Sequence, residues 1–340
     1  MPLVNLAEVL DPACAAGRGV GAFNVIGVEH AEGIVAGAES AGLPVVLQVS
    51  ENCVRFHAAL APIGDAVLAI ARAAAVPVAA HLDHATSAEL VEEAASLGFG
   101  SAMFDASARD YADNVAATAA VAAWGARRGM LIEAEIGEIG GKDGVHAPGV
   151  RTRPDEAAAY AAATGVRALA VAVGTSHAML SRDAVIDLEL IARIRDAVPV
   201  PLVLHGSSGV PDDQLAAAVR AGMTKINIAT QLNKVFTAAV RASLAARPAL
   251  VDPRRYGGDG RAAVAAEVAR LLAVVAAPPS FLLPERIAKE ARARTWSTRP
   301  RRMGQAGRMR SSATPCAGTV ALMAAPVLPA LPLAHRLLST

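Results

Sequence analysis

Short apolar runs alternate with longer amphipathic stretches along most of this chain. Each run is rich in valine, leucine, isoleucine or alanine, and most lead into a segment with helical spacing. The predicted strands are Val20–Val25, Pro44–Val49, Pro77–Leu82, Phe99–Phe104, Met130–Glu135, Ala168–Gly174, Pro201–Gly206 and Met223–Ile228. The predicted helices are Asn5–Ala16, Glu29–Ala41, Ser87–Leu97, Ala112–Arg127, Asp155–Thr164, Leu188–Ala197, Asp212–Ala221, Gln231–Leu244 and Asp259–Ala276.

The predicted strands are nearly continuous in apolar residues rather than alternating with polar ones. Such strands are typical of a parallel sheet that is covered by helices. Eight strand-then-helix units predict an α/β fold of the (β/α)8 TIM barrel type. An open doubly wound sheet is the alternative, but the first run is not followed by a GxGxxG sequence.

The composition changes after the last predicted helix. We expect one barrel domain over residues 1–277 and a separate tail over residues 278–340. The tail is rich in arginine, proline and alanine, and its acidic residues are Glu285 and Glu290. This composition predicts a disordered extension. Its final apolar stretch contains Pro326, Pro329 and Pro332, which argue against a membrane span.

Composition and charge narrow the class of protein. The formal net charge of the 340-residue chain is +1, so no global field favours nucleic acid or membranes as partners. The three cysteines lack the spacing of a disulfide framework or a metal site. The first residues lack a basic flank followed by an apolar segment, so no signal peptide is predicted. We therefore expect a reduced, cytoplasmic protein.

Polar side chains gather at the carboxyl ends of the predicted strands. They are Asn24, Ser50, Asp83, His84, Asp105, Glu135, His177, His205 and Asn227. In a barrel these ends converge on one mouth, where active sites are built. The sequence therefore predicts that residues far apart along the chain form one pocket.

Three of these residues suggest a metal centre. His84, His177 and His205 follow three different strands, and three protein ligands with an open position describe a catalytic zinc site. Asp83, next to His84, is the expected acid and base, although it can instead serve to orient a histidine. Asp105 and Glu135 are candidates for a second divalent cation or for support of the first, and Asp105 can alternatively cap the segment that follows it.

Small residues follow the last strands and predict a phosphate site. The runs HGSSGV and NIAT allow backbone N–H groups to approach an anion, and loops in this place often bind phosphate in barrels. The glycine-rich stretch Gly137–Val150 is interpreted as a lid. Its Asp143 can carry a proton when the lid is closed. Lys225, on the last strand, is the rival catalytic group through a Schiff base.

The motifs AFN, LQVSE, HLDHA, MFDAS, EAEIGEIGG, VAVGTSH, LHGSSGVP, KINIAT and DPRRY resemble those of class II, metal-dependent ketose-bisphosphate aldolases. The resemblance runs from Met1 to about Val275. It implies zinc on the three histidines, Asp83 as proton donor, and Asp105 and Glu135 as secondary metal positions. The residues that it implies for substrate contacts are Asn24, Ser50, Ala178, Gly206, Ser207, Ser208, Asn227, Ile228, Ala229, Thr230 and Arg254.

The resemblance also implies the reaction and the partners. The expected substrate is fructose or tagatose 1,6-bisphosphate, cleaved reversibly to dihydroxyacetone phosphate and glyceraldehyde 3-phosphate, and the NIAT run is more similar to the tagatose branch. In the family the arginine matched by Arg254 reaches a phosphate from a neighbouring subunit, so a homo-oligomer, a dimer or tetramer, is expected. The resemblance further suggests a second divalent cation and a monovalent cation beside Zn²⁺.

Two residues depart from the family pattern. Ala178 stands where the family has glycine after the second zinc histidine, and Asp143 stands where the lid acid is commonly glutamate. These departures keep two alternatives open. One is a sugar-phosphate-binding subunit without catalytic activity, and the other is a barrel hydrolase that uses the metal to activate water.

Overall fold

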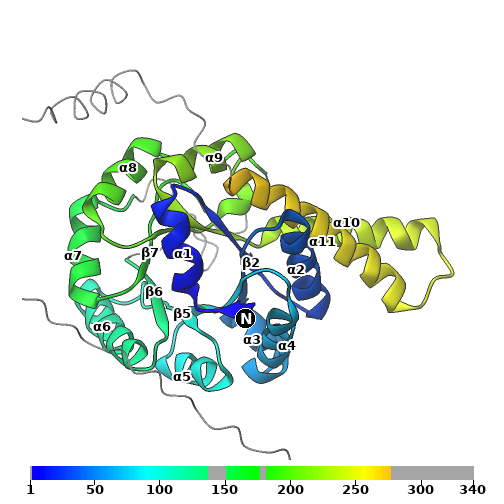
Figure 1. Cartoon of the computed structure of the whole chain (residues 1–340), viewed down its shortest axis with the longest axis horizontal. Helices are drawn as coiled ribbons and strands as arrows, with labels where there is room; N and C mark the ends of the chain where they lie inside the picture. Colours follow the sequence, from blue (N-terminus) through cyan, green and yellow to red (C-terminus); the bar gives the residue numbers. More distant parts are fainter. Residues whose placement is uncertain (1, 137–150, 177–180, 277–340) are drawn as a thin grey trace, which may run out of the picture. The chain divides into compact units, whose positions relative to one another are not determined.

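Eight parallel strands close into a barrel with helices around it (Figure 1). The computed structural model describes residues 2–136, 151–176 and 181–276. The barrel strands are β2 (Val20–Asn24), β3 (Val45–Ser50), β4 (Val78–Ala85), β5 (Ser101–Phe104), β6 (Leu131–Glu135), β7 (Ala168–Ala170), β8 (Leu202–Leu204) and β9 (Met223–Ile228). Each strand pairs in parallel with its neighbours, and β9 pairs with β2 to close the ring. The predicted TIM barrel is therefore confirmed, and the open sheet is excluded.

The helices follow the strands in the predicted order. They are α1 (Leu6–Ala15), α2 (Val28–Ala41), α3 (Glu51–His57), α4 (Leu60–Ala73), α5 (Ala88–Leu97), α6 (Tyr111–Arg127), α7 (Pro154–Thr164), α8 (Leu188–Ala197), α9 (Asp212–Ala221), α10 (Thr230–Ala246) and α11 (Pro253–Val275). A short strand, β1 (Leu3–Val4), pairs with the start of β4, and a single 3₁₀ turn, η2 (Ser207–Gly209), follows β8. The predicted tail, residues 278–340, lies outside the described residues.

The structure differs from the prediction in several places. The pair α3 and α4 was not predicted; the two helices are separated where Ala58 adopts a φ of 61°. Helix α11 begins six residues earlier than predicted, because Asp252 caps it and Pro253 occupies its first turn. Strands β7 and β8 are shorter than their apolar runs.

Helix α1 closes the amino-terminal end of the barrel. Asn5 caps this helix: its side chain accepts from the Ala7 N–H, and the Glu8 carboxylate accepts from the Asn5 N–H. The apolar face of α1 packs against inward-facing side chains of the strands. This inner core contains Leu6, Val9, Leu10, Ala13, Val20, Ala22, Val46, Ala79, Leu131, Ala168, Ala170, Ala172 and Val203.

Above this apolar plug the barrel interior becomes polar. Because side chains alternate along a strand, the next inward positions form a layer of their own. They include Gln48, His81, Ser101, Glu133 and Lys225, each with an exposed fraction of 0%. Several of the inward positions beyond them, at the carboxyl ends of the strands, line a pocket. A second, larger core of aliphatic side chains fills the space between the strands and the helices.

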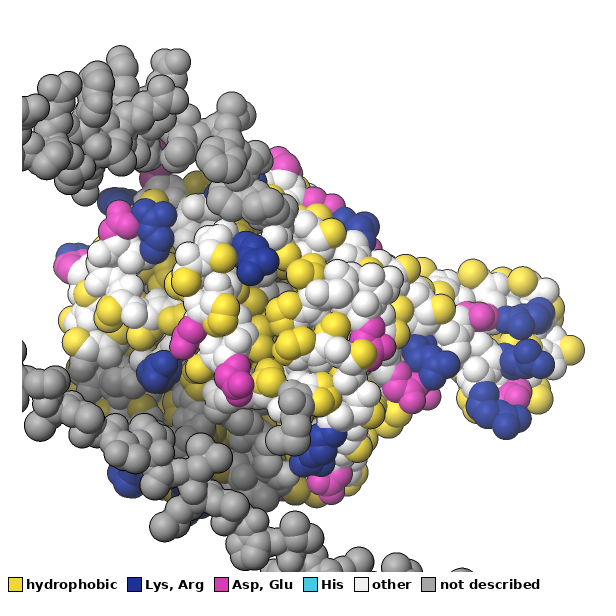
Figure 2. Space-filling model, viewed as in Figure 1, with side chains coloured by type: hydrophobic (Ala, Val, Ile, Leu, Met, Phe, Trp, Pro, Cys, Tyr) yellow, Lys and Arg dark blue, Asp and Glu magenta, His cyan; other side chains and the backbone are white. Residues whose placement is uncertain are grey.

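Two helices form an arm that projects from the barrel. Helices α10 and α11 extend beyond it together (Figure 1), and Leu232 and Ser243 are the buried residues of α10. Charged side chains gather at the outer end of this arm (Figure 2). Among the described residues no single helix is long and apolar enough to span a membrane, whereas α3 and α4 meet that test only as a bent pair.

Candidate active site

A pocket of about 220 Å³ opens at the carboxyl ends of the strands. Its lining residues are Asn24, Ser50, Asn52, Asp83, His84, Ser176, His205, Gly206, Ser208, Asn227, Ala229 and Thr230. All but Asn52 and Ser176 were predicted as site residues. The barrel therefore brings together side chains that are separated by more than two hundred positions, as the strand-end pattern indicated.

His84 lies inside β4 rather than beyond its end, where the sequence had placed it. The register between β4 and β5 shifts between Leu82 and Ala85, and His84 takes a φ of 53° at this irregularity. An extra residue in a strand re-aims the side chains around it. The ring Nδ1 of His84 is 2.7 Å from Asp105 Oδ2, while Asp105 Oδ1 accepts from the Ser107 hydroxyl at 2.6 Å. Asp105 thus fixes the ring of His84.

His205 follows β8 and faces His84 across the pocket. Its Nδ1 is 3.1 Å from Nε2 of His84, and the two rings are nearly perpendicular. Two imidazole nitrogens that point at each other need a proton or a cation between them. Two nitrogens bound to one tetrahedral zinc ion at the usual bond length lie ~3.4 Å apart. The two rings therefore fit a shared metal ion with little movement.

Acidic groups complete two candidate ligand sets. One ligand atom each from Asp83, His84 and His205 lies within 4.8 Å of the other two, and the same holds for His84, Asp105 and Glu135. The first set surrounds the gap between the two imidazoles. The second lies on the other side of His84, where the sequence suggested a secondary metal position.

Asp83 is held by a chain of amides on the floor of the pocket. Asn24 Nδ2 donates to Asp83 Oδ2 at 3.3 Å, and Gln48 Nε2 donates to Asn24 Oδ1 at 2.9 Å. The other oxygen, Oδ1, is buried without a hydrogen-bond partner among the described residues. Burial alone would raise the pKa of Asp83, but the charges of His84 and Lys225 outweigh it and lower the pKa. A buried carboxylate with one unused oxygen is suited to accept a proton from a ligand.

The loops after β8 and β9 pack closely. A Cβ on Gly206, which has a φ of 67°, would lie 2.5 Å from the backbone oxygen of Ser176, so this position requires glycine. Ser208 Oγ accepts from the N–H groups of Ala229 and Gln231 at 3.2 Å each. Helix α10 begins at Thr230, and its N-cap residue, Ala229, has no side chain that could cap it. The pocket thus has a helix amino terminus at its rim, which favours an anion.

Comparison with known proteins agrees with this geometry. The family described as fructose-bisphosphate aldolase class II matches residues 4–277. A fructose-bisphosphate aldolase of Geobacillus stearothermophilus is 37% identical over 272 residues, 79% of this chain and 95% of that protein. One from Thermus caldophilus is 37% identical over 289 residues, 77% of this chain and 94% of that protein. This chain belongs to the class II fructose-bisphosphate aldolase family.

A solved structure supports the assignment. The crystal structure of the YdjI aldolase from Escherichia coli K12 matches with a TM-score of 0.70 and 29% identity, over 82% of this chain and 98% of that one. The present chain is therefore an aldolase, a lyase on a TIM barrel, and class II aldolases depend on zinc.

Several predicted residues do not line the aldolase pocket. Ser207 Oγ donates to the Leu204 carbonyl at 3.0 Å, and the Ile228 side chain packs in the outer core. Arg254 lies at the start of α11 with its side chain 89% exposed and paired to Asp252. The predicted residues His177, Ala178 and Asp143 lie outside the described residues.

Lys225 is buried below the pocket rather than within it. Its Nζ is 2.8 Å from Glu133 Oε2 and 3.4 Å from His81 Nε2, and none of the three side chains is exposed. An amine so enclosed does not meet a substrate carbonyl. The Schiff-base alternative is therefore not supported by the position of Lys225.

Glu133 was missed by the sequence analysis. Its Oε1 is 3.1 Å from Nε2 of His205, on the side of the ring away from His84. It stands between Ile132 and Ala134 within an apolar strand, so it does not fall at a strand end. The available signal was the alternation of the strand, which places Glu133 on the same face as Glu135.

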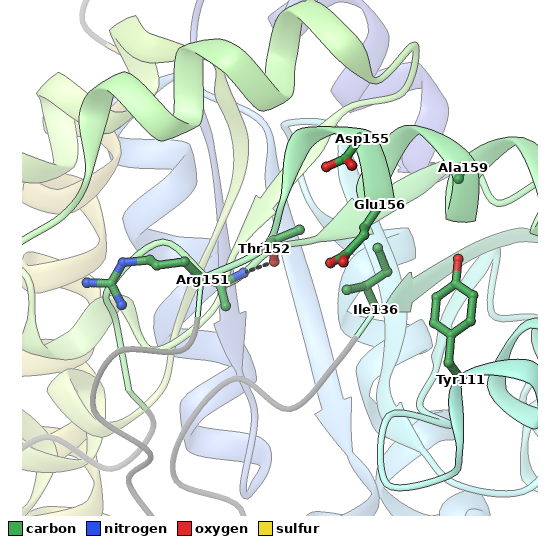
Figure 3. Close-up of a pocket in the computed structure, with 8 residues that line it drawn as sticks. Tyr111, Ile136, Arg151, Thr152, Asp155, Glu156 and Ala159 are labelled. Atoms are coloured by element: carbon green, nitrogen blue, oxygen red, sulfur yellow. Dashed lines mark hydrogen bonds between the residues drawn. The ribbon is translucent and has the colours of Figure 1, made fainter.

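A larger cavity, of about 590 Å³, shares no lining residue with the aldolase pocket. Tyr111, Arg151, Asp155 and Glu156 are among its lining residues (Figure 3). Ile136 and Arg151, also in its wall, flank residues 137–150, which are outside the described part of the chain. No ligand is assigned to this cavity.

The protonation of His84 in the metal-free enzyme tests whether the acidic groups of the pocket act on its ring. Burial opposes protonation, but Asp83, Asp105 and Glu135 favour it more strongly and raise the pKa of His84 from 6.5 to about 9. Because the folded pKa lies above the unfolded one, the stability that His84 contributes is present below pH 6.5 and is lost as the pH rises through about 9. Urea unfolding of chelator-treated enzyme across this range should show that decline, and His84→Gln should flatten it.

An NMR titration of metal-free enzyme measures the same group directly. The His84 ring should titrate near pH 9 in the wild type and at lower pH in Asp105→Asn. A ring that titrates at or below 6.5 would show that the acidic groups do not hold a proton on His84.

Proposed function

We propose that this aldolase cleaves and forms a ketose 1,6-bisphosphate, fructose or tagatose, with dihydroxyacetone phosphate and glyceraldehyde 3-phosphate as the products of cleavage. The observation that carries the proposal is the approach of His84 Nε2 to His205 Nδ1, at 3.1 Å, beside Asp83 at the mouth of the barrel. The names of the relatives from Geobacillus and Thermus point to fructose bisphosphate, and the NIAT run points to tagatose bisphosphate.

His84, His177 and His205 are the proposed zinc ligands. The imidazole nitrogens of His84 and His205 lie at a separation that suits two ligands of one zinc ion. His177 is included because Ser176, the residue before it, lines the pocket. When bound, zinc would supply the positive charge that stabilises the negative charge developing on the substrate oxygens. Asp105, which contacts His84, and Glu135 are proposed as the secondary divalent site. A monovalent cation is proposed near Ala178.

Asp83 is the proposed acid and base. In the cleavage direction its ionised carboxylate accepts the proton of the substrate hydroxyl next to the breaking carbon–carbon bond, and in condensation it returns that proton. The amides of Asn24 and Gln48 hold the carboxylate in place, so that its free oxygen faces the ligand. Asp143 in the lid stretch is the proposed carrier of the second, carbon-bound proton.

Asn227 is the proposed hydrogen-bond donor to the substrate. Its Nδ2 lies 3.1 Å from Nε2 of His205, while its amide oxygen is buried without a hydrogen-bond partner among the described residues. Because Nε2 of His205 already faces the Glu133 carboxylate and acts as a donor, the amide oxygen is the better neighbour for the ring. Rotation of the amide by 180° achieves this and leaves the NH₂ group as a donor for a substrate oxygen.

The phosphate of dihydroxyacetone phosphate is proposed to bind between the loops Gly206–Ser208 and Asn227–Thr230. Ser50 and Ala229 line the same pocket. The N–H groups of residues 229 and 231 meet at Ser208 Oγ, close to the amino terminus of α10, and can turn to a phosphate oxygen. Ser207 and Ile228 would contribute main-chain groups, because their side chains point elsewhere.

The second phosphate of the substrate needs a cation as a partner. No lysine or arginine is among the described residues that line the pocket. Arg254, at the outer end of the α10–α11 arm, is proposed to reach the pocket of a neighbouring copy in a homodimer or tetramer. The arm is suited to such a contact, because α10 buries few of its own residues.

The domain boundaries and the compartment are proposed from the extent of the family match and from the cysteines. The family match ends at residue 277, which supports a barrel domain over residues 1–277 and a separate tail over residues 278–340. Cys14 and Cys53 are free cysteines, in agreement with a reduced cytoplasmic compartment.

A coupled cleavage assay over a panel of ketose bisphosphates, with and without chelator, tests the proposed reaction. We expect cleavage of fructose or tagatose 1,6-bisphosphate that is abolished by chelation and restored by zinc. Borohydride with substrate should leave the enzyme unlabelled. Zinc-loaded enzyme that cleaves no ketose bisphosphate would favour the non-catalytic subunit, and hydrolysis without binding of dihydroxyacetone phosphate would favour a hydrolase.

Replacement of Asp83 tests its role as acid and base. Asp83→Ala should lower kcat by about 10²–10⁴-fold, the usual scale for loss of such a group. Zinc content, measured by elemental analysis, should stay at the wild-type level. Loss of zinc together with activity would instead assign Asp83 to support of the metal site.

Co-expression of two inactive variants tests the proposed role of Arg254. A hetero-dimer of Asp83→Ala and Arg254→Ala contains one site in which both residues are intact. With random pairing, half of the dimers are mixed, so activity should recover to about a quarter of the wild-type value. If Arg254 acts within its own chain, co-expression will restore nothing beyond the sum of the two variants.

A further inference from the structure

A layer of buried polar side chains separates the aldolase pocket from the apolar plug of the barrel. It contains His81 from β4, Ser101 from β5, Glu133 from β6 and Lys225 from β9, all with an exposed fraction of 0%. Isolated charges in such a place are strongly destabilising, so each must be paired. The proposed function uses none of these four residues.

The distances determine where the protons lie. An ammonium group only donates, so Nε2 of His81, 3.4 Å from Lys225 Nζ, must be unprotonated. The proton of His81 is then on Nδ1, which donates to Ser101 Oγ at 2.9 Å, and that hydroxyl donates to the Ala80 carbonyl. Burial and the charge of Lys225 lower the pKa of His81 well below its usual value, in agreement with a neutral ring.

Glu133 joins this layer to the metal pocket. One oxygen, Oε2, pairs with Lys225 Nζ at 2.8 Å, and the other, Oε1, is 3.1 Å from Nε2 of His205. A carboxylate paired with an ammonium group accepts hydrogen bonds, so Nε2 of His205 carries the ring proton. The lone pair of His205 Nδ1 is therefore left facing His84, 3.1 Å away.

We propose that Glu133 is a positioning residue that sets the tautomer and orientation of His205 for zinc, with Lys225 as its buried counter-charge. This inference rests on the proposed zinc site. A carboxylate on the outer nitrogen of a ligating histidine fixes the ring and raises its basicity, and its loss commonly lowers metal affinity about 10–100-fold. Lys225 contributes because its ammonium group donates to both Glu133 and His81. These hydrogen bonds keep Glu133 directed at His205 and His81 directed at Ser101.

The decisive experiment separates this role from a purely structural one. Glu133→Met/Lys225→Met removes both charges and replaces them with flexible apolar chains, which usually preserves stability where a single removal does not. We expect thermal unfolding close to that of the wild type, but zinc affinity lowered about 10–100-fold in competition with a chelator. The absorption spectrum of the Co²⁺-substituted enzyme should change as well, because His205 is no longer held.

Ser101→Ala is the matched control. It removes a hydrogen bond from the same layer without contact to His205, so zinc affinity should stay within about twofold of the wild type. If Glu133→Met/Lys225→Met does not fold, Glu133→Gln, which removes only the charge, should still show weaker zinc binding.

Two results would overturn the proposal. One is wild-type zinc affinity and Co²⁺ spectrum in whichever Glu133 variant folds, and the other is an equal loss of affinity in Ser101→Ala. A wild-type enzyme that binds no zinc would instead overturn the proposed metal site itself, so the two failures are distinguishable.

Discussion

The approach of two imidazoles at the mouth of a closed barrel is the interaction on which this aldolase site depends. His84 and His205 come from strands on different sides of the barrel, and only closure of the sheet brings their nitrogens to 3.1 Å. Each ring is held from behind by a carboxylate, His84 by Asp105 and His205 by Glu133. The rings therefore face each other because their outer nitrogens are already engaged, which prepares the gap between them for a cation.

The barrel interior is organised so that this arrangement can be buried. Aliphatic side chains and α1 fill its amino-terminal end, and the charges of Glu133 and Lys225 neutralise each other in the layer above. Such a pair adds little net stability compared with apolar residues, and the loss of one partner costs much more. Its value is in orientation, because the layer forms a polar floor below the pocket and Glu133 in this layer holds the ring of His205.

The fold was predictable because the strands are buried on both faces, which leaves nearly continuous apolar runs in the sequence. Asp83, His84, His205 and Asn227 could be predicted as pocket residues because each lies at the carboxyl end of an apolar run, and these ends meet at the mouth of a barrel. Glu133 was missed because it lies in the middle of an apolar strand. Its counter-charge, Lys225, is ninety-two positions away in the sequence. Pairing across a barrel leaves no local signal. The irregularity at His84 was also hidden, because nothing in HLDHA requires a positive φ.

That irregularity connects the backbone to the chemistry. A non-glycine residue with positive φ in a strand costs about 1–3 kcal/mol, and it persists only where its surroundings hold it. Here the surroundings are the Asp105 carboxylate and the facing ring of His205. In a regular strand Asp83 and His84 would point to opposite sides of the sheet, and one of them would leave the pocket. With the bulge both line it, so the local strain is what lets the proposed proton carrier, Asp83, and the proposed metal ligand, His84, occupy adjacent positions.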